Sequence, residues 1–581
     1  MKTFYKLLSS LFILNTYAQI PNFSWAKTSS AINKDITTDS LGNVYIVGDF
    51  AGTVDFNPSN LPADTFYLRT NTSYITNAFI LKLNSMGNFL WAKQVGSFDW
   101  DNANTVVVDA TGNIIVGGNF KSMVDFDPNP TSTYTLAASN TDGFVMKLNG
   151  AGDFIWAKNN VTSGLLDWTV DLATDPTGNI YLAGVFNSVA DFDPSGATYT
   201  IQPVGPSNAY VQKLDANGDF IWAKGFVGTT TFSSNDKSQI FSLSLDASNN
   251  IYTFGQFYDI IDFDPDATTQ FTLIGNEYPF VSKLDANGNF VWAKSFTGST
   301  ASGTPGKAVV DATGNVFVNS TFRGVMDFDP DPVNTFTLQS FGTGTSEDIC
   351  IYKLNNTGTL NWVKQFGDLY QDNGSAIDLD NQGNIYATGV FQGTVDFNAS
   401  PTATNNLVNP YGSGLEVFIT KLDGNGNYID ARRIGGGGIN NVNAVNVDTK
   451  NTPYFCGEYA NSFGVVFDLD PGPTTQFTVT SYSAPNSSYA IKLGGAMSIG
   501  LNEILTTNNL SIYPNPTNSI LNIELNNINS PETILITNVL GKVVLTEIAT
   551  TINSTLNIQN LNSGIYFLQI GNTKAVKFIK E

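Results

Sequence analysis

The sequence contains no histidine, only two cysteines and few charged side chains. Charged residues make up 13% of the chain, and 28 Lys and Arg stand against 50 Asp and Glu, a net charge of -22 at pH 7. Without imidazole, Ser-His-Asp triads, Cys-His dyads and HExxH zinc sites are excluded. The negative charge disfavours binding to phosphate backbones and anionic lipid headgroups, so we expect no nucleic-acid partner. Any catalysis would have to use carboxylates, Tyr, Lys or a bound metal.

Long apolar runs are also lacking, apart from a short one at the N-terminus. Lys2 and Lys6 precede the apolar residues 7–14, and the small residue Ala18 follows them. This order is typical of a secretory signal, and the run is too short to span a bilayer. We predict a signal peptide over residues 1–18, cleaved between Ala18 and Gln19, with a retained N-terminal anchor as the alternative. We expect no transmembrane segment in the mature protein.

What the sequence does contain is a repeat with a period of 65 to 70 residues. Trp-Ala-Lys begins at Trp25, Trp91, Trp156, Trp222 and Trp292, becomes Trp-Val-Lys at Trp362 and is reduced to Asp430-Ala431-Arg432. Lys-Leu begins at Lys82, Lys147, Lys213, Lys283, Lys353, Lys421 and Lys492. Asp-Phe-x-Pro begins at Asp55, Asp125, Asp191, Asp262 and Asp327, with weaker copies at Asp396 and Asp468. Each of the last two markers gives seven copies.

Each copy has the pattern of four short β-strands, A to D. In the second copy, residues 105–109, 113–120, 143–148 and 154–158 are apolar or alternating runs separated by Gly-containing turns. This pattern predicts antiparallel sheet. Cys350 and Cys456 stand where other copies carry apolar residues, which predicts two small core residues and no disulfide.

The two ends of the repeat region complement each other. Residues 22–27 form a strand D with no A to C before it, whereas the last copy has A (443–448), B (454–459) and C (489–493) but no D. Over residues 19–494 we therefore predict an all-β fold, a seven-bladed β-propeller closed by the N-terminal strand. A linear solenoid would need capping repeats, and the sequence has none at either end.

These residues resemble a known repeat family. The combination of a strand A ending in Asp, a GN-aromatic-x-x-G segment, a Lys-Leu strand and a Trp is similar to the SBBP-type β-propeller repeat of bacterial exported proteins. The resemblance covers about residues 20–494, and Asp101, Asp167 and Asp372 match the family's Asp before strand A. It implies the propeller fold and no defined activity.

Residues 495–509 are predicted to be a linker, and residues 510–581 have a different composition, without Trp. This segment is expected to form a small C-terminal β-sandwich. It resembles the C-terminal sorting domain (type A) of the type IX secretion system of Bacteroidetes, through Tyr513, Pro514, Asn515, Pro516, Gly541, Gly564, Tyr566, Lys577 and Lys580. The resemblance implies the translocon and its sortase as partners, and a secreted or outer-membrane surface protein after periplasmic transit. An immunoglobulin-like accessory module is the alternative.

The Asp-Phe-x-Pro segments are inserts between strands B and C, and a propeller would gather them on one face. Two acidic side chains in one insert suit Ca²⁺, whereas an Asp that caps a turn needs no cation. We favour turn formation, and Ca²⁺ is the only cofactor for which the sequence offers candidates. The candidate ligands are Asp125, Asp127, Asp191, Asp193, Asp262, Asp264, Asp327, Asp329, Asp468 and Asp470. The Asp-rich loops 215–219, 285–289 and 423–427 are expected to be hairpin turns.

Four aromatic residues break the repeat in the loops from strand D to the next strand A. They are Trp100, Trp168, Phe232 and Tyr370. Aromatic rings that depart from a repeat are candidates for binding a glycan or protein ligand, and the alternative of equal weight is that they are loop aromatics lying in crevices between blades. We therefore predict an exported, non-catalytic scaffold for binding or adhesion. The alternative is a secreted carbohydrate-acting enzyme that uses Asp carboxylates.

Overall fold

The computed structural model describes most of the chain after residue 18. The described residues are 19–57, 64–162, 164, 167–229, 236–298, 306–342, 346–400, 402–412, 414–459, 466–472, 476–480, 487–494, 510–525, 532–538, 542–549, 551, 553–570 and 576–581. The predicted signal peptide (1–18), the predicted linker (495–509), Phe232 and Gly541 lie outside them. Within these ranges the chain is all β, and none of it forms a helix that would span a membrane.

The chain divides into two compact units, Met1–Gly495 and Ala496–Glu581. In the first unit each repeat supplies four main strands, as expected from the alternation of apolar and polar residues. The first strands are β2 (Ile32–Thr38), β8 (Asn102–Val108), β13 (Trp168–Thr174), β19 (Lys237–Leu245), β24 (Lys307–Val310), β30 (Asn373–Leu379) and β36 (Asn441–Val447). The second strands are β3 (Val44–Ala51), β9 (Ile114–Asp125), β14 (Ile180–Phe186), β20 (Ile251–Asp262), β25 (Val316–Arg323), β31 (Ile385–Phe391) and β37 (Pro453–Glu458).

The outer half of each sheet is formed by the third and fourth strands. The third strands are β6 (Thr76–Leu83), β10 (Thr135–Leu148), β17 (Asn208–Leu214), β21 (Thr272–Leu284), β28 (Glu347–Leu354), β34 (Glu416–Leu422) and β40 (Ser488–Leu493). The fourth strands are β7 (Phe89–Val95), β11 (Phe154–Asn159), β18 (Phe220–Gly228), β22 (Phe290–Ser295), β29 (Leu360–Phe366), β35 (Tyr428–Ile434) and β1 (Phe23–Ser29). All main-strand pairs within a repeat are antiparallel, and pairing of β18 with β20 joins the third and fourth repeats into one eight-stranded sheet.

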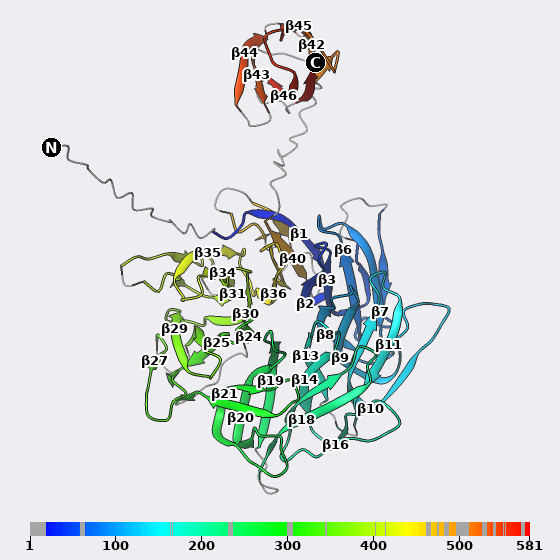
Figure 1. The fold of residues 1–581 in the computed structure, drawn as a ribbon, viewed down its shortest axis with the longest axis vertical. Helices are drawn as coiled ribbons and strands as arrows, with labels where there is room; N and C mark the ends of the chain where they lie inside the picture. Colours follow the sequence, from blue (N-terminus) through cyan, green and yellow to red (C-terminus); the bar gives the residue numbers. More distant parts are fainter. Residues whose placement is uncertain are drawn as a thin grey trace, which may run out of the picture. The chain divides into compact units, whose positions relative to one another are not determined.

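The last sheet has the order β1-β40-β37-β36, so the N-terminal strand supplies its fourth strand. In this pairing Trp25 lies opposite Lys492, and Ser29 lies opposite Ser488. The first strand of each sheet contacts the first strand of the next, and β2 contacts both β8 and β36. Figure 1 shows these first strands gathered in the middle of the unit, with the fourth strands toward its outside.

The core of the first unit lies between neighbouring sheets. One cluster combines Trp25, Cys456 and Ala490 of the last sheet with Ile46 and Phe79 of the first sheet. Apolar residues on both faces of the second and third strands explain this arrangement, because each sheet is covered on both sides. Both cysteines are buried and free, which confirms the predicted core role.

Short strands form the inserts and the links between sheets. In the second and fourth repeats, the long strands β9, β10, β20 and β21 extend into the inserts. In the other repeats the insert strands are separate: β4 (Thr53–Asp55), β5 (Tyr67–Arg69), β15 (Ala190–Asp191), β16 (Thr200–Ile201), β26 (Val325–Asp327), β27 (Thr337–Gln339), β32 (Thr394–Asp396), β33 (Asn406–Val408), β38 (Val466–Asp468) and β39 (Thr478–Thr480). Two linking strands, β12 (Val161–Thr162) and β23 (Thr297–Gly298), precede the third and fifth sheets.

The second unit contains two antiparallel sheets around its own core. The first sheet has β41 (Leu510–Tyr513), β42 (Ile520–Leu525) and β45 (Asn553–Asn557). The second has β43 (Glu532–Asn538), β44 (Val543–Ala549), β46 (Gly564–Ile570) and β47 (Val576–Lys580). Leu521 and Leu556 of the first sheet pack with Ile536, Leu568 and Phe578 of the second. This is the architecture of a small sandwich.

Candidate functional site

The first Asp of each insert caps a turn. In the second repeat, Asp125 Oδ1 accepts the main-chain N–H groups of Asp127 (3.0 Å) and Tyr134 (2.8 Å). The first Asp of each other insert also accepts two main-chain N–H groups; these residues are Asp55, Asp191, Asp262, Asp327, Asp396 and Asp468. The following Phe126 is fully buried. The Asp therefore caps each insert loop, and the next residue, Phe in six inserts and Leu469 in the seventh, lies in the core.

The second acid of the insert shapes the same loop. Asp127 Oδ1 accepts the N–H of Asn129 (2.9 Å), and Asp127 Oδ2 accepts the hydroxyl of Ser132 (2.6 Å). Asp264 has the same kind of partners in the fourth repeat, the N–H of Asp266 and the hydroxyl of Thr269. In the described ranges, no group of three or more acidic or thiol side chains lies together as a metal site. This geometry supports the favoured role in turn formation, and Ca²⁺ binding stays the untested alternative.

At four places the chain that leaves a fourth strand pairs with the next insert. Thr297 pairs with Asp327, Val161 with Asp191, and Val227 with Asp262. The inserts and the linking loops thus lie together, and we call the surface that they form the insert face. The sequence did not predict this pairing, because each of the paired segments contributes only two residues to it.

The predicted binding aromatics lie on three different repeats. Trp100, in the loop between β7 and β8, is 56% exposed, and Lys121 Nζ lies 5.3 Å from its ring centroid. Tyr370, between β29 and β30, is 54% exposed, and its N–H donates to Asp368 Oδ1 (2.8 Å). Trp168 is the first residue of β13 and is 40% exposed, so it belongs to a strand and not to the loop predicted from the sequence. The structure does not bring these rings together.

Two further exposed apolar residues accompany these aromatics. Phe98 shares its loop with Trp100 and is 78% exposed, and Leu369 precedes Tyr370 and is 70% exposed. The sequence carried the same signal for them, since they too break the repeat, but it gave no measure of their exposure. The loops β7–β8 and β29–β30 therefore each expose two adjoining apolar side chains.

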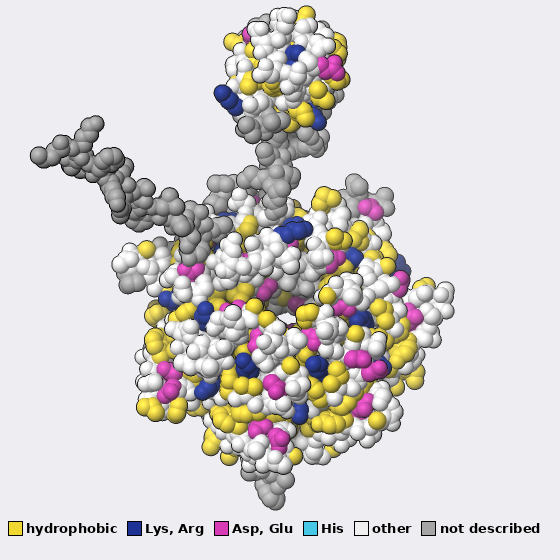
Figure 2. Space-filling view, viewed as in Figure 1, with side chains coloured by type: hydrophobic (Ala, Val, Ile, Leu, Met, Phe, Trp, Pro, Cys, Tyr) yellow, Lys and Arg dark blue, Asp and Glu magenta, His cyan; other side chains and the backbone are white. Residues whose placement is uncertain are grey.

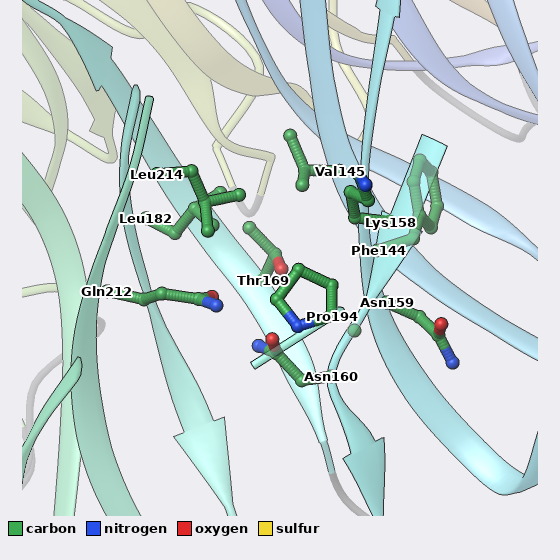
Figure 3. A pocket seen from close by; sticks show the side chains of 11 residues that line it. Phe144, Val145, Lys158, Asn159, Asn160, Thr169, Leu182, Pro194, Gln212 and Leu214 are labelled. Atoms are coloured by element: carbon green, nitrogen blue, oxygen red, sulfur yellow. The ribbon is translucent and has the colours of Figure 1, made fainter. Parts of the chain in front are cut away.

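A crevice beside the third insert is filled by packing. Figure 3 shows Gln212 and Thr169 directed toward Pro194 of the insert and Asn160 of the preceding repeat. Gln212 Nε2 donates to the carbonyl of Phe192 (2.6 Å). The side chains leave no space for a water molecule, so this crevice is an interface between sheets and not a ligand site.

Buried carboxyl groups lie behind the insert face. Thr162 Oγ1 is within hydrogen-bonding distance of both Asp142 and Asp167. Because a hydroxyl donates only one proton, one of these carboxyls must itself be protonated to satisfy both contacts. Burial raises the pKa of Asp142 and Asp167 to about 6, and that of Asp372 to about 8. All three side chains are closed off from solvent.

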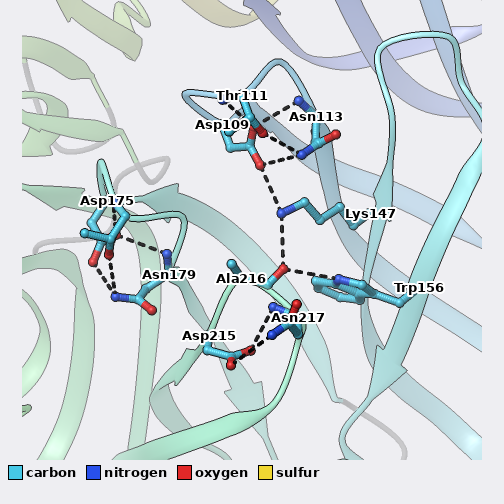
Figure 4. Close-up of polar contacts among 11 residues, drawn as sticks. Asp109, Thr111, Asn113, Lys147, Trp156, Asp175, Asn179, Asp215, Ala216 and Asn217 are labelled. Carbon is cyan, nitrogen blue, oxygen red and sulfur yellow. Dashed lines mark hydrogen bonds and ion pairs between the residues drawn. The ribbon is translucent and has the colours of Figure 1, made fainter.

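The hairpin turns at the other end of the strands form a second surface, the turn face. Figure 4 shows Lys147 between the Asp109 carboxylate (2.9 Å) and the carbonyl of Ala216 (3.2 Å). Trp156 Nε1 donates to the same carbonyl (3.4 Å), and a Cβ on Gly218 would lie 3.1 Å from the Trp156 ring. The recurrent Trp therefore packs against the turn of the next sheet. A groove of about 320 Å³ runs past these residues, and their polar groups are already paired.

The sorting-type residues of the second unit join its two sheets. Asn515 Nδ2 donates to the carbonyl of Lys577 (3.0 Å), and the N–H of Ile579 donates to Asn515 Oδ1 (2.9 Å). Tyr566 is buried, and its hydroxyl donates to the carbonyl of Asn562 (2.9 Å). Lys580 is buried, whereas Tyr513 and Lys577 are exposed. The motif residues thus serve the fold of this unit, and the exposed ones are open to a partner.

Two family models match the chain. Residues 511–581 match the secretion system C-terminal sorting domain, and residues 361–390 match the β-propeller repeat. Among curated proteins, an uncharacterized WD repeat-containing protein, L264, of Acanthamoeba polyphaga mimivirus is 24% identical over 502 residues, 75% of this chain and 36% of that protein. The regulatory protein FlaEY of Caulobacter vibrioides is 25% identical over 197 residues, 33% of this chain and 19% of that protein. The chain thus spans about a third and a fifth of their lengths.

One solved structure similar to this chain is that of PorZ, a bacterial surface component of the type IX secretion system of Porphyromonas gingivalis. It is 10% identical, with a TM-score of 0.24, and the match covers 95% of this chain and 82% of that protein. A likeness at this level carries no inference about activity.

Proposed function

We propose that this chain, which carries an SBBP β-propeller repeat and a C-terminal sorting domain of the type IX secretion system, is an exported binding scaffold. The sorting domain implies passage through the type IX translocon to the cell surface or the medium. In our proposal, signal peptidase first cleaves between Ala18 and Gln19, and the sortase then removes residues from about 510 onward. The repeat unit is the functional product.

We further propose that the repeat sheets close into a seven-bladed ring. Two observations support this. Strand β1 completes the last sheet by pairing with β40, and strand β2 of the first sheet contacts β36 of the last. Main-chain and side-chain bonds also join these two repeats, for example from Asn443 Nδ2 to the carbonyl of Asn33 (2.7 Å). A closed ring leaves only short, protected strand edges.

The observation that carries the binding proposal is the pair of apolar clusters on the insert face. Phe98 with Trp100, and Leu369 with Tyr370, each place two large exposed apolar side chains in one loop. Figure 2 shows that exposed apolar side chains elsewhere are interspersed with polar ones on the visible face. Aromatic side chains of this kind stack on sugar rings or anchor a protein partner. Because the chain has a net charge of -22, we propose a neutral or cationic ligand, such as an uncharged glycan.

The rival proposal is a carbohydrate-acting enzyme. Hydrolysis of a glycosidic bond needs two carboxyl groups roughly 5 to 10 Å apart beside an open cleft. Asp142 and Asp167 favour this alternative, since a pKa of about 6 suits a general acid. Their burial weighs against it, because a substrate has no access to them. The insert acids are half-buried or buried, and the first acid of each insert accepts main-chain N–H groups in a turn.

A neutral-glycan array and a hydrolysis screen, run on the same mature protein, test the proposal. We expect glycan binding without turnover, and we expect Trp100→Ala and Tyr370→Ala each to weaken binding about tenfold or more. Leu41→Ala is the matched control, because Leu41 is a comparably exposed apolar residue in a turn of the opposite face. Turnover that disappears in Asp142→Asn would favour the enzyme and contradict our proposal.

A further inference from the structure

The sixth repeat departs from the others at one well-defined place. Asp430 and Arg432 stand where the six other repeats carry Trp and Lys, and Asp430 lies opposite Lys421 as Trp156 lies opposite Lys147. The backbone is unchanged, so the departure concerns only what these side chains contact.

In the other repeats, the Trp and Lys pack on a turn of the next sheet. Trp362 and Lys364 of the fifth sheet pack against Gly426. A Cβ built on Gly426 would lie 3.0 Å from the nearest atom of each of these two side chains. The seventh sheet has no such turn, because its fourth strand is β1 and comes from the N-terminal end of the chain. The segment before β1 occupies the corresponding place.

Asp430 and Arg432 bind the main chain of that segment. The N–H of Ile20 donates to Asp430 Oδ2 (3.1 Å). Arg432 Nη1 donates to the carbonyl of Pro21 (3.3 Å), Arg432 Nη2 donates to the carbonyl of Ile20, and Arg432 Nε donates to Asp430 Oδ2 (3.1 Å). One carboxylate and one guanidinium thus satisfy three consecutive polar groups of the main chain.

Two further contacts hold the same segment. Ile20 is buried and belongs to the core cluster that contains Ile434 and Leu493. The N–H of Gly494, directly after β40, donates to the carbonyl of Asn22 (2.7 Å). Pro21 suits the site, since it has no N–H that would need an acceptor.

We infer that Asp430 and Arg432 form a recognition site for the main chain of residues 20–21, and that this site locks strand β1 into the last sheet. The inference rests on the proposed ring closure but not on any ligand of the insert face. Its ligand is a peptide segment of this chain in which an apolar side chain, Ile20, is followed by Pro21. On this inference, Asp430-Ala431-Arg432 replaces Trp-Ala-Lys because the seventh sheet has no turn on which a Trp could pack.

The decisive variant restores the repeat. Asp430→Trp with Arg432→Lys returns the sixth copy to the sequence of its neighbours, which in a simple degenerate repeat would preserve or raise stability. Our inference predicts the opposite, because the variant removes all three main-chain bonds. Measured by hydrogen exchange on the mature full chain, we expect the amides of β1 to exchange about tenfold faster or more, while those of β8 and β9 stay unchanged.

Two single variants complete the test. Arg432→Gln removes the guanidinium alone and decides the question if the double variant does not fold, again by faster exchange in β1. Lys364→Arg, at the equivalent position of the fifth sheet, is the matched control and should leave β1 unchanged. The inference would be overturned if β1 kept its protection from exchange in both the double variant and Arg432→Gln. Uniformly faster exchange across the whole unit would overturn it as well. Lack of β1 protection in the unaltered chain would refute ring closure itself, whatever the glycan assays give.

Discussion

At the scale of single residues, the turn glycines of the repeat face two different surroundings. Gly112 has φ +84° and nothing within 4 Å of where a Cβ would be, whereas a Cβ on Gly152 (φ +82°) would lie 2.8 Å from Lys93 and 3.1 Å from Trp91. Both need the left-handed conformation, which costs an L-residue roughly 1 to 2 kcal/mol. Only Gly152 would add a clash with the preceding sheet.

We therefore predict unequal effects of the same substitution. Gly112→Ala should lower the free energy of unfolding by about 1 kcal/mol, through the backbone alone. Gly152→Ala should cost at least about 1 kcal/mol more, because the Trp91 ring must shift. Urea denaturation of both variants measures the difference. Equal losses would show that the contact between Trp91 and the turn contributes nothing to stability.

Asp109 explains why each first strand ends in an acidic residue. Although burial acts to raise its pKa, hydrogen bonds from Thr111, Lys147 and Asn113 lower the pKa to about 2. The sequence pattern of Asp followed by Gly-Asn predicted the turn. It did not predict that Lys147 of the Lys-Leu marker reaches the same carboxylate, since that contact spans 38 residues of the chain and depends on strand pairing.

At the scale of elements, the inserts lead to a prediction about metal removal. Five of them keep both acids, and five weak sites at ten times their Kd would together stabilise the fold by on the order of 7 kcal/mol. In the structure one oxygen of the first acid already accepts two N–H groups. We therefore expect melting temperatures with Ca²⁺ and with a chelator to agree within about 2 °C, by calorimetry. A large shift that falls by about a fifth in Asp125→Asn with Asp127→Asn would establish Ca²⁺ sites instead.

How far the sequence predicts these elements depends on whether the signal is repeated. The strands, the turns and the packing role of Trp156 recur in several copies, so comparison within the chain was enough to predict them. The pairing of Thr297 with Asp327 escaped prediction because it is short and joins different repeats. The partner of Arg432 escaped it too, because the repeat marks a departure but does not say which distant segment, here Ile20 and Pro21, fills the place.

At the scale of the whole molecule, buried acids predict an unusual pH dependence. Burial raises the pKa in the folded protein to about 6 for Asp35, Asp101, Asp142, Asp167, Asp348 and Asp378, and to about 8 for Asp372. These groups prefer the proton when folded, so their contribution to stability is complete below the unfolded pKa of about 4 and is lost as pH rises toward 6 to 8. Asp109, with a lowered pKa, acts in the opposite sense below about pH 4.

We accordingly expect the mature protein to be more stable at pH 5 than at pH 8. Repulsion among its excess negative charges acts in the same direction. The measurement is the urea midpoint at both pH values and constant ionic strength. Asp372→Asn should flatten the decline between pH 6 and 8, whereas Asp127→Asn, in an accessible insert, serves as the control. Higher stability at pH 8 than at pH 5 would contradict the prediction.

The contact between sheets in the first unit has a direction. Trp91 lies over Gly152 of the second sheet, Trp156 over Gly218 of the third, and Trp25 of the last sheet over Gly87 of the first. Six of the contacts between neighbouring sheets are of this kind and run head to tail, whereas between the sixth and seventh sheets Asp430 and Arg432 bind the segment before β1 instead. In the proposed closed ring, this series of contacts returns to its start and leaves no end free. A chain that leaves its first strand unpaired carries a free head and a free tail, the geometry from which copies of a protein associate into open filaments.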